Sequence, residues 1–198
     1  MNLIDRAKNI LITPKTEWEV IKNENLTTAE MYTGYAVILA AIPAAASFIG
    51  NSLIGVSVPF TSINFKYPIG SGLIYAVLYY ILSLVSVYVV ALVMDALAPS
   101  FGASKNFNAS LKVTIFSSTA AWIAGIFSIL PVLSILSILG LYSLYLLYLG
   151  MKTLKDSPAD KLVGYYVVLL LIMIVIYVVI GIVVGAIAFA GYDLPRMM

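Results

Sequence analysis

The sequence lacks cysteine and histidine altogether, and only 10% of its 198 residues are charged. Without these two residue types the chain can form no disulfide, no thiolate nucleophile, no Cys/His zinc site and no imidazole that transfers protons. Charged residues make up about a quarter of a typical soluble domain, so there is too little polar surface to cover a water-soluble core. These absences argue against a soluble enzyme, and we expect no catalytic residue, no cofactor and no metal.

Basic residues are few as well, and they do not cluster. Eleven lysines and arginines oppose nine acidic residues, which gives a net charge of +2. Nucleic-acid surfaces combine clustered Lys and Arg with interleaved aromatic residues, and no segment of this chain has that pattern. The sequence therefore predicts no nucleic acid among its partners.

Apolar residues, in contrast, form 62% of the chain. The uncharged stretches 31–65, 67–94, 113–151 and 162–192 each exceed the roughly 20 residues that a helix needs to cross a bilayer. The third stretch, 39 residues long, would extend about 58 Å as one helix at 1.5 Å per residue, nearly twice the hydrocarbon thickness. Pro131 near its middle removes a backbone donor and predicts a turn, the alternative being one kinked helix.

The fold class that follows is all-α, a polytopic membrane protein with a bundle of five transmembrane helices. We expect the spans at 31–54, 69–94, 113–130, 132–150 and 162–190. Residues 1–30 are expected to form a short amphipathic arm outside the bilayer, and residues 31–198 the transmembrane domain.

The distribution of basic residues predicts how the bundle is oriented. With five spans, nine of the eleven lie on one side of the bilayer, namely Arg6, Lys8, Lys15, Lys22, Lys105, Lys112, Lys152, Lys155 and Lys161. Only Lys66 and Arg196 lie on the other side. Because cytoplasmic loops carry an excess of Lys and Arg, we expect a protein of the cell membrane with a cytoplasmic N-terminus and an external C-terminus.

The N-terminal arm shows helical periodicity. Its first apolar residues recur at helical spacing, and they are Leu3, Ile4, Ala7, Ile10 and Leu11. Thr13 and Pro14 can open a second helix as N-cap and first residue, with Trp18 on its apolar face. The sequence TTAE at 27–30 is a capping box that sets the start of the first span. Two interpretations stay open: an interfacial anchor with Trp18 at headgroup depth, or an arm that binds a partner.

Asp95 is the one acidic residue attached to a span, at the expected cytoplasmic end of the second helix. It could be a solvated anchor or a partner of Lys112 or Lys152, and it could also form a buried proton or ion site. Tyr145 and Tyr148 lie along the inner half of the fourth helix, where phenols either pack between helices or line a polar cleft. We therefore name Asp95, Tyr145 and Tyr148 as a candidate cleft.

Small residues indicate where helices approach closely. Gly181 and Gly185 form a GxxxG pattern in the last span, which favours helix packing, either inside the bundle or in a dimer. Pro131 is expected to shape the hairpin between the third and fourth spans.

Four segments of the chain are distinctive, and they are FGASKNFNASLKVTIFSST (101–119), ILPVLSILSILGLYSLYLLYLGM (129–151), KLVGYYVV (161–168) and TPKTEWEVI (13–21). Together they resemble one family of five-span membrane proteins, the Yip1 family and particularly its prokaryotic branch. The family often has a proline where this chain has Ala120 and Ala121, which implies a straighter third helix. The resemblance implies the five-span fold and a non-enzymatic membrane role. Eukaryotic relatives are associated with Rab GTPases and vesicle traffic through a longer N-terminal region, so no GTPase-binding residue is carried over.

Two functions follow as hypotheses. The first is an adaptor that organises membranes and binds other membrane proteins or a second copy of itself, with a cytoplasmic surface of Trp18, Lys105, Phe107 and Lys155. The alternative is a carrier or channel for a small solute or lipid, in which the candidate cleft opens to the cytoplasm. The lipid bilayer is a partner in both.

Overall fold

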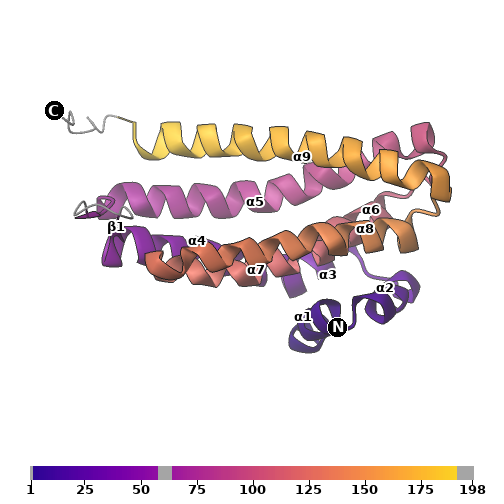
Figure 1. Ribbon diagram of the computed structural model, residues 1–198, viewed down its shortest axis with the longest axis horizontal. Helices are drawn as coiled ribbons and strands as arrows, with labels where there is room; N and C mark the ends of the chain where they lie inside the picture. The colour runs from indigo at the N-terminus through magenta and orange to yellow at the C-terminus, as the bar shows by residue number, and fades with distance from the viewer. Residues whose placement is uncertain (1, 58–63, 191–198) are drawn as a thin grey trace.

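The computed structural model describes residues 2–57 and 64–190, and these form a bundle of long helices with two short helices at its side (Figure 1). The short helices are α1 (Leu3–Ile12) and α2 (Pro14–Asn23). Five segments are long and apolar enough to cross a membrane, and they are Thr28–Ile54, Ile69–Phe101, Phe107–Ile129, Val132–Leu154 and Ala159–Ala188. The predicted all-α bundle of five spans is therefore confirmed. Arg196 lies outside the described residues.

Within these spans the helices change type at several points. The first contains α3 (Thr28–Met31), a π-helical segment (Tyr32–Ala36), α4 (Val37–Phe48) and a second π-helical segment (Ile49–Ile54). The second is α5 (Ile69–Leu97), extended by a 3-10 turn (Ala98–Phe101). The third is α6 (Phe107–Ser117), α7 (Thr119–Ala124) and a 3-10 segment (Gly125–Ile129). A further 3-10 segment (Pro131–Leu141) leads into α8 (Tyr142–Leu154), and the chain continues with α9 (Ala159–Ala188).

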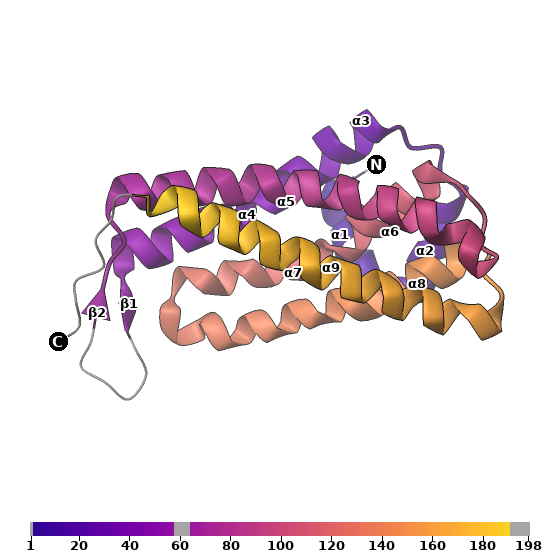
Figure 2. The same cartoon turned by 90° about the horizontal axis from the view of Figure 1, so that it is seen from above.

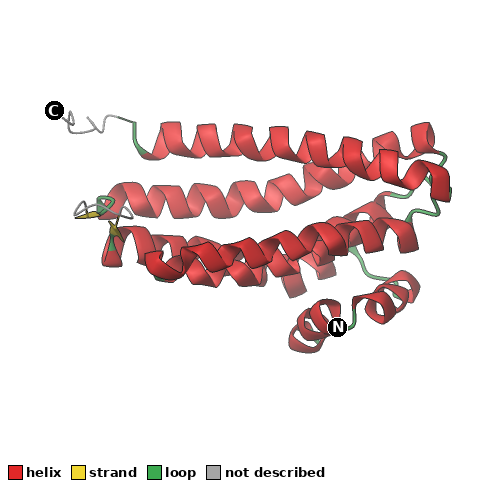
Figure 3. Cartoon of the chain, viewed as in Figure 1, coloured by secondary structure: helices red, strands yellow, loops and turns green. Residues whose placement is uncertain are grey.

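The chain folds back between the third and fourth spans, where Leu130 adopts an extended backbone conformation (φ −110°, ψ 111°) between two 3-10 segments. This turn lies at the position predicted from Pro131. At the same end of the bundle, the strand β1 (Val56–Ser57) follows the first span and the strand β2 (Asn64–Phe65) precedes the second. They pair antiparallel with Val56 opposite Phe65. Figure 3 shows that helices make up most of the described chain.

Every difference of three or more residues between the expected and observed spans lies at one end of the bundle. There the spans begin or end at Thr28, Phe101, Phe107, Leu154 and Ala159, where the sequence predicted 31, 94, 113, 150 and 162. The prediction stopped each span at its first charge, whereas the helices continue past Asp95, Lys112 and Lys152 because their charged side chains are paired or reach the surface. We call this end, which carries most of the lysines, the basic end.

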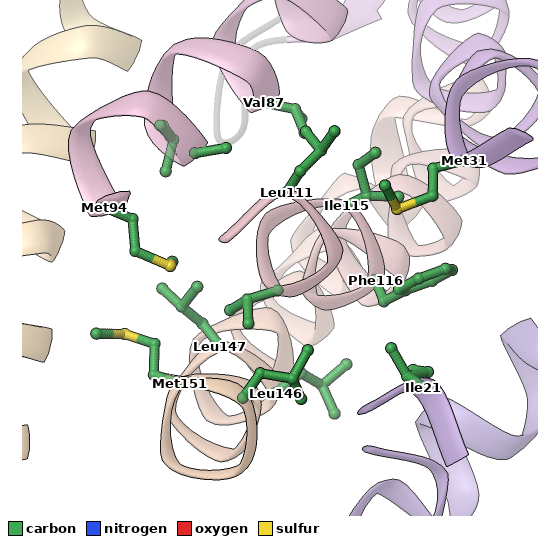
Figure 4. Packing of buried hydrophobic residues seen from close by; sticks show 14 of the residues in the cluster. Ile21, Met31, Val87, Met94, Leu111, Ile115, Phe116, Leu146, Leu147 and Met151 are labelled. Atoms are coloured by element: carbon green, nitrogen blue, oxygen red, sulfur yellow. The ribbon is translucent and has the colours of Figure 1, made fainter. Parts of the chain in front are cut away.

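The helices form layers, with α9 on the outside along α5 and the two short helices on the opposite side (Figures 1 and 2). Helix α6 lies at the centre, and all its residues from Ser110 to Ser117 are buried. Figure 4 shows Leu111, Ile115 and Phe116 of α6 surrounded by side chains of α2, α3, α5 and α8. The core therefore joins the N-terminal arm to the transmembrane helices.

Candidate functional site

A buried ion pair joins α5 to the end of α8 at the basic end. The Lys155 ammonium lies 3.2 Å from the Asp95 carboxylate, and it donates hydrogen bonds to the Ser110 hydroxyl at 2.8 Å and the Asn106 carbonyl at 3.3 Å. Lys155 is fully buried and Asp95 is 8% exposed. An ammonium has three N–H donors, and all three have acceptors here. The arrangement ties three helices together, because Asn106 and Ser110 belong to the start of α6.

The electrostatics of this network depend on burial. Burial lowers the pKa of the Lys155 ammonium, while the hydrogen bond to Asp95 and its negative charge oppose that shift. Taking either partner away would leave an uncompensated charge in a protein interior, which typically costs about 3–5 kcal/mol. The backbone fixes the lysine as well, since the Ser104 amide donates to the Lys155 carbonyl at 2.9 Å.

Tyr165 connects α9 to the same end of the bundle. Its buried hydroxyl donates to the Met94 carbonyl, and its ring stacks on Phe101 with centroids 5.1 Å apart. A tyrosine can bury its ring only when its hydroxyl has a partner, and the carbonyl beside Asp95 supplies one. The basic end is thus fixed by side chains from α5, α6, α8 and α9.

A second ionic cluster holds the N-terminal arm. The Arg6 guanidinium donates to Glu17 at 2.5 Å and to Glu24, so one side chain links α1 to both ends of α2. Arg6 also lies over the Phe116 ring of α6, 5.5 Å from its centroid. Lys112 of α6 donates to the carbonyls of Ile21 and Glu24 at 3.0 and 2.5 Å. A cation at the C-terminal end of a helix is favourable, because the carbonyl oxygens of the last turn carry partial negative charge.

Apolar contacts complete the docking of the arm. Trp18 is fully buried against Gly150 of α8, where an added Cβ would lie 2.7 Å from the indole ring. Tyr142 of α8 donates to the Leu11 carbonyl at 3.1 Å, and Asn108 of α6 donates to the Leu26 carbonyl at 2.8 Å. The interpretation of Trp18 as a headgroup-depth anchor is therefore wrong, because the side chain is covered by protein.

Of the two helix caps predicted for the arm, the one at Thr27 is confirmed and the one at Thr13 is wrong. Thr27 and Glu30 form the predicted capping box, with the Thr27 amide donating to Glu30 at 2.8 Å and the Glu30 amide donating to the Thr27 hydroxyl at 3.2 Å. Thr13, in contrast, makes no side-chain cap on α2, because its hydroxyl donates backward to the Asn9 carbonyl at 3.2 Å. Pro14 does occupy the first turn of α2, as predicted.

The structure does not assemble the candidate cleft in the expected way. Asp95 pairs with Lys155, and neither Lys112 nor Lys152 is its partner. Tyr148 packs edge-on against the Tyr166 ring of α9, with centroids 5.5 Å apart, and Tyr145 is 43% exposed on the outside of α8. Deeper in the bundle, a cavity of about 10 Å³ between α5, α6, α8 and α9 has room for about one water molecule.

Two of the four residues expected on a partner surface are not on a surface. Trp18 and Lys155 are fully buried in the arm contact and the ion pair. Lys105 is exposed in the connection before α6, and Phe107 is half-buried with its ring 5.1 Å from that of Tyr88. Lysine and tryptophan both occur often at membrane interfaces, so the sequence interpretation placed Trp18 and Lys155 on a surface. It did not identify the specific contacts that bury them here.

Gly181 and Gly185 of the last span do not pack against the described part of the bundle. A Cβ added at Gly181 or Gly185 would meet nothing within 4 Å among the described residues. The packing role within one chain is therefore wrong for both, and the dimer alternative is left. At Pro131 the backbone begins the fourth span's 3-10 segment, in agreement with a turn at this point.

The sequence interpretation missed Arg6, Glu17, Glu24 and Ser110, which hold the two clusters together. One signal was available for Glu17, since it lies beside Trp18 on the side of α2 that faces the bundle. In the described part of the chain, no group of three or more His, Cys, Asp or Glu residues could hold a metal ion.

Five apolar spans joined by a buried core define a polytopic α-helical membrane protein. A family model of the Yip1 domain matches residues 8–190, nearly the whole length. The chain belongs to the Yip1 family, as its sequence motifs indicated. The matched range includes most of the docked arm as well as the spans. No curated protein and no solved structure matches the chain.

Proposed function

We propose that this protein is a non-enzymatic adaptor that organises other membrane proteins, or copies of itself, by lateral contact in the bilayer. The observation that supports this role is the pairing of its buried charges. Lys155 uses its donors on Asp95, Ser110 and Asn106, so the network is complete without a solute. A carrier needs a polar group that exchanges partners along a hydrated path, and the pairing of Asp95 weighs against that alternative.

The orientation proposed from the positive charges places the basic end in the cytoplasm of the cell. The docked arm lies at this end, so it would form part of a folded cytoplasmic face with the connections after α5 and α8. An arm held by buried ion pairs presents a fixed surface, which suits recognition because less freedom is lost on binding.

The outer face of α9 is the proposed site of lateral contact. Large apolar side chains on this helix are exposed, among them Ile174, Val175 and Ile182 at 58%, 61% and 65%. Gly181 and Gly185 on the same helix leave its backbone open to close approach. Small residues spaced four apart allow two membrane helices to pack backbone against backbone.

Crosslinking in native membranes, followed by mass spectrometry, tests this proposal. The natural chain is compared with Gly181→Leu/Gly185→Leu, which adds bulk where an added Cβ meets none of the described residues. Gly70→Leu is the matched control, because a Cβ at Gly70 also meets nothing within 4 Å. We expect one membrane partner, or a second copy, to be recovered with the natural chain and the control, and to fall several-fold with the double variant. Recovery of no specific partner, or equal recovery with all three chains, would contradict the proposal.

A further inference from the structure

A groove of about 390 Å³ opens between α2 and the last turns of α8. The α2 side contributes Lys15, Glu19 and Lys22. The α8 side contributes Leu149, Lys152 and Thr153, and Asp156 follows the helix. The groove exists because the arm is docked, so residues distant in sequence form its two walls.

The positive charge in this groove is only partly balanced. Lys22 lies 3.7 Å from Asp156, in an ion pair whose side chains are 45% and 66% exposed and which therefore contributes little to stability. Among the described residues, no carboxylate lies within 4.0 Å of the Lys15 or Lys152 ammonium. Both lysines are exposed, so two ammonium groups face the groove without a close counterion.

The α8 wall changes character along its length. Tyr145, Leu149 and Lys152 are spaced four and three residues apart, which places them on one face of the helix. That face runs from a 43% exposed phenol, through a half-buried leucine, to an exposed ammonium at the basic end. Tyrosines collect where the hydrocarbon meets the headgroups, so Tyr145 on this face favours a position of the groove at headgroup level. A phospholipid has the same order, from acyl chains to charged phosphate.

We propose that the groove binds one anionic phospholipid. Its phosphate lies between Lys15 and Lys152, where the Thr153 hydroxyl is a further donor, and its acyl chains run along Leu149 and Tyr145. Basic pockets beside transmembrane helices favour anionic headgroups on electrostatic grounds. Because the lipid contacts both walls, its binding also strengthens the docking of α2 on α8. This site is independent of the lateral contact on α9.

Native mass spectrometry of the full chain in detergent tests the site directly. Phosphatidylglycerol and phosphatidylcholine with the same acyl chains are titrated separately, and bound lipid is counted. We expect one molecule of phosphatidylglycerol to be retained in clear preference to phosphatidylcholine. The double variant Lys15→Gln/Lys152→Gln should weaken that binding on the order of tenfold. The control Lys8→Gln/Lys161→Gln removes the same charge from two exposed lysines that do not line the groove, and it should bind within about twofold of the natural chain.

Three results would overturn the proposal. Equal retention of the two lipids would show that the phosphate charge is not recognised. Equal weakening in the two double variants would assign the effect to overall charge. Displacement of phosphatidylglycerol by inorganic phosphate at the same concentration would make the groove a site for a free anion. The single variants Lys15→Gln and Lys152→Gln repeat the comparison if the double variant does not fold, and circular dichroism checks the fold of each.

Discussion

Both the basic end and the outer face of α9 are built from apolar helices, but they differ in how closely those helices are joined to the rest of the chain. At the basic end, Asp95, Lys155 and Arg6 are buried and have partners from other helices. Along α9, a Cβ added at Gly181 or Gly185 would meet nothing within 4 Å among the described residues. Apolar side chains alone do not distinguish one helix neighbour from another in lipid, because lipid tails are equally apolar.

This difference shows how the bundle selects which helices pack against one another. Polar partners that cannot be replaced by lipid select which helices meet, and here they select α5, α6, α8, the arm and the end of α9 that carries Tyr165. The outer face of α9 around Gly181 and Gly185 has no such partner among the described residues, so it remains available to lipid or to another membrane protein. Substitutions at the two regions should therefore differ greatly in their effect on stability.

The largest effect is expected for Lys155→Met. This substitution leaves the Asp95 carboxylate buried without its counterion, and we expect a loss of about 3–5 kcal/mol in the free energy of unfolding. Unfolding in mixed micelles with increasing denaturing detergent measures it. Lys105→Met, at an exposed lysine of the same end, should change stability by less than about 0.5 kcal/mol. The double variant Asp95→Leu/Lys155→Met should regain most of the loss, and a failure to regain it would mean that the pair is not the cause.

Arg6→Met should have the next largest effect, and one confined to the arm. Glu17 then loses its buried partner, so α1 and α2 leave the bundle more often, at a cost of up to about 3 kcal/mol. Hydrogen exchange of the arm amides reports this opening, and we expect rates to rise at least about tenfold. Lys8→Met, on the exposed side of α1, is the matched control. Unchanged exchange in Arg6→Met would show that the arm stays docked without the Arg6 ion pairs.

Gly150→Ala tests those apolar contacts. The new methyl group would lie 2.7 Å from the Trp18 ring, so the indole and its helix must move, at a cost of about 1–3 kcal/mol. Thermal unfolding of the detergent-solubilised protein measures the change. Gly34→Ala, where the added Cβ meets nothing within 4 Å, should be neutral or slightly stabilising. Equal stability of the two variants would contradict the close contact of α2 with α8.

Gly181→Leu/Gly185→Leu should have the smallest effect on stability. Leucine is a better helix former than glycine, and both positions are open, so the free energy of unfolding of the monomer should stay the same or rise slightly. The same detergent titration measures it. A loss of more than about 1 kcal/mol would reveal a contact on α9 within one chain and would remove the contrast between the two regions.

The number of spans and the location of the turns followed from the sequence, since hydropathy and Pro131 are local signals. The ion-pair partner of Asp95 did not follow from the sequence. Lys152 is closer in sequence to the expected end of the fourth span, but Lys155, one turn later, points into the bundle. To choose between the two lysines, one must know how α8 is rotated about its own axis. The packing of α8 against α6 sets that rotation.

The sequence by itself determined that lipid surrounds five helices, because unpaired backbone groups cannot remain in hydrocarbon and helices satisfy them internally. Only the tertiary structure decided which charges pair, where the amphipathic arm binds and which glycines stay open. Each of these depends on contacts between residues far apart in sequence, such as Lys112 with the carbonyl of Ile21. Hydropathy is a property of each segment alone, whereas a hydrogen-bond partner is a property of the assembled bundle.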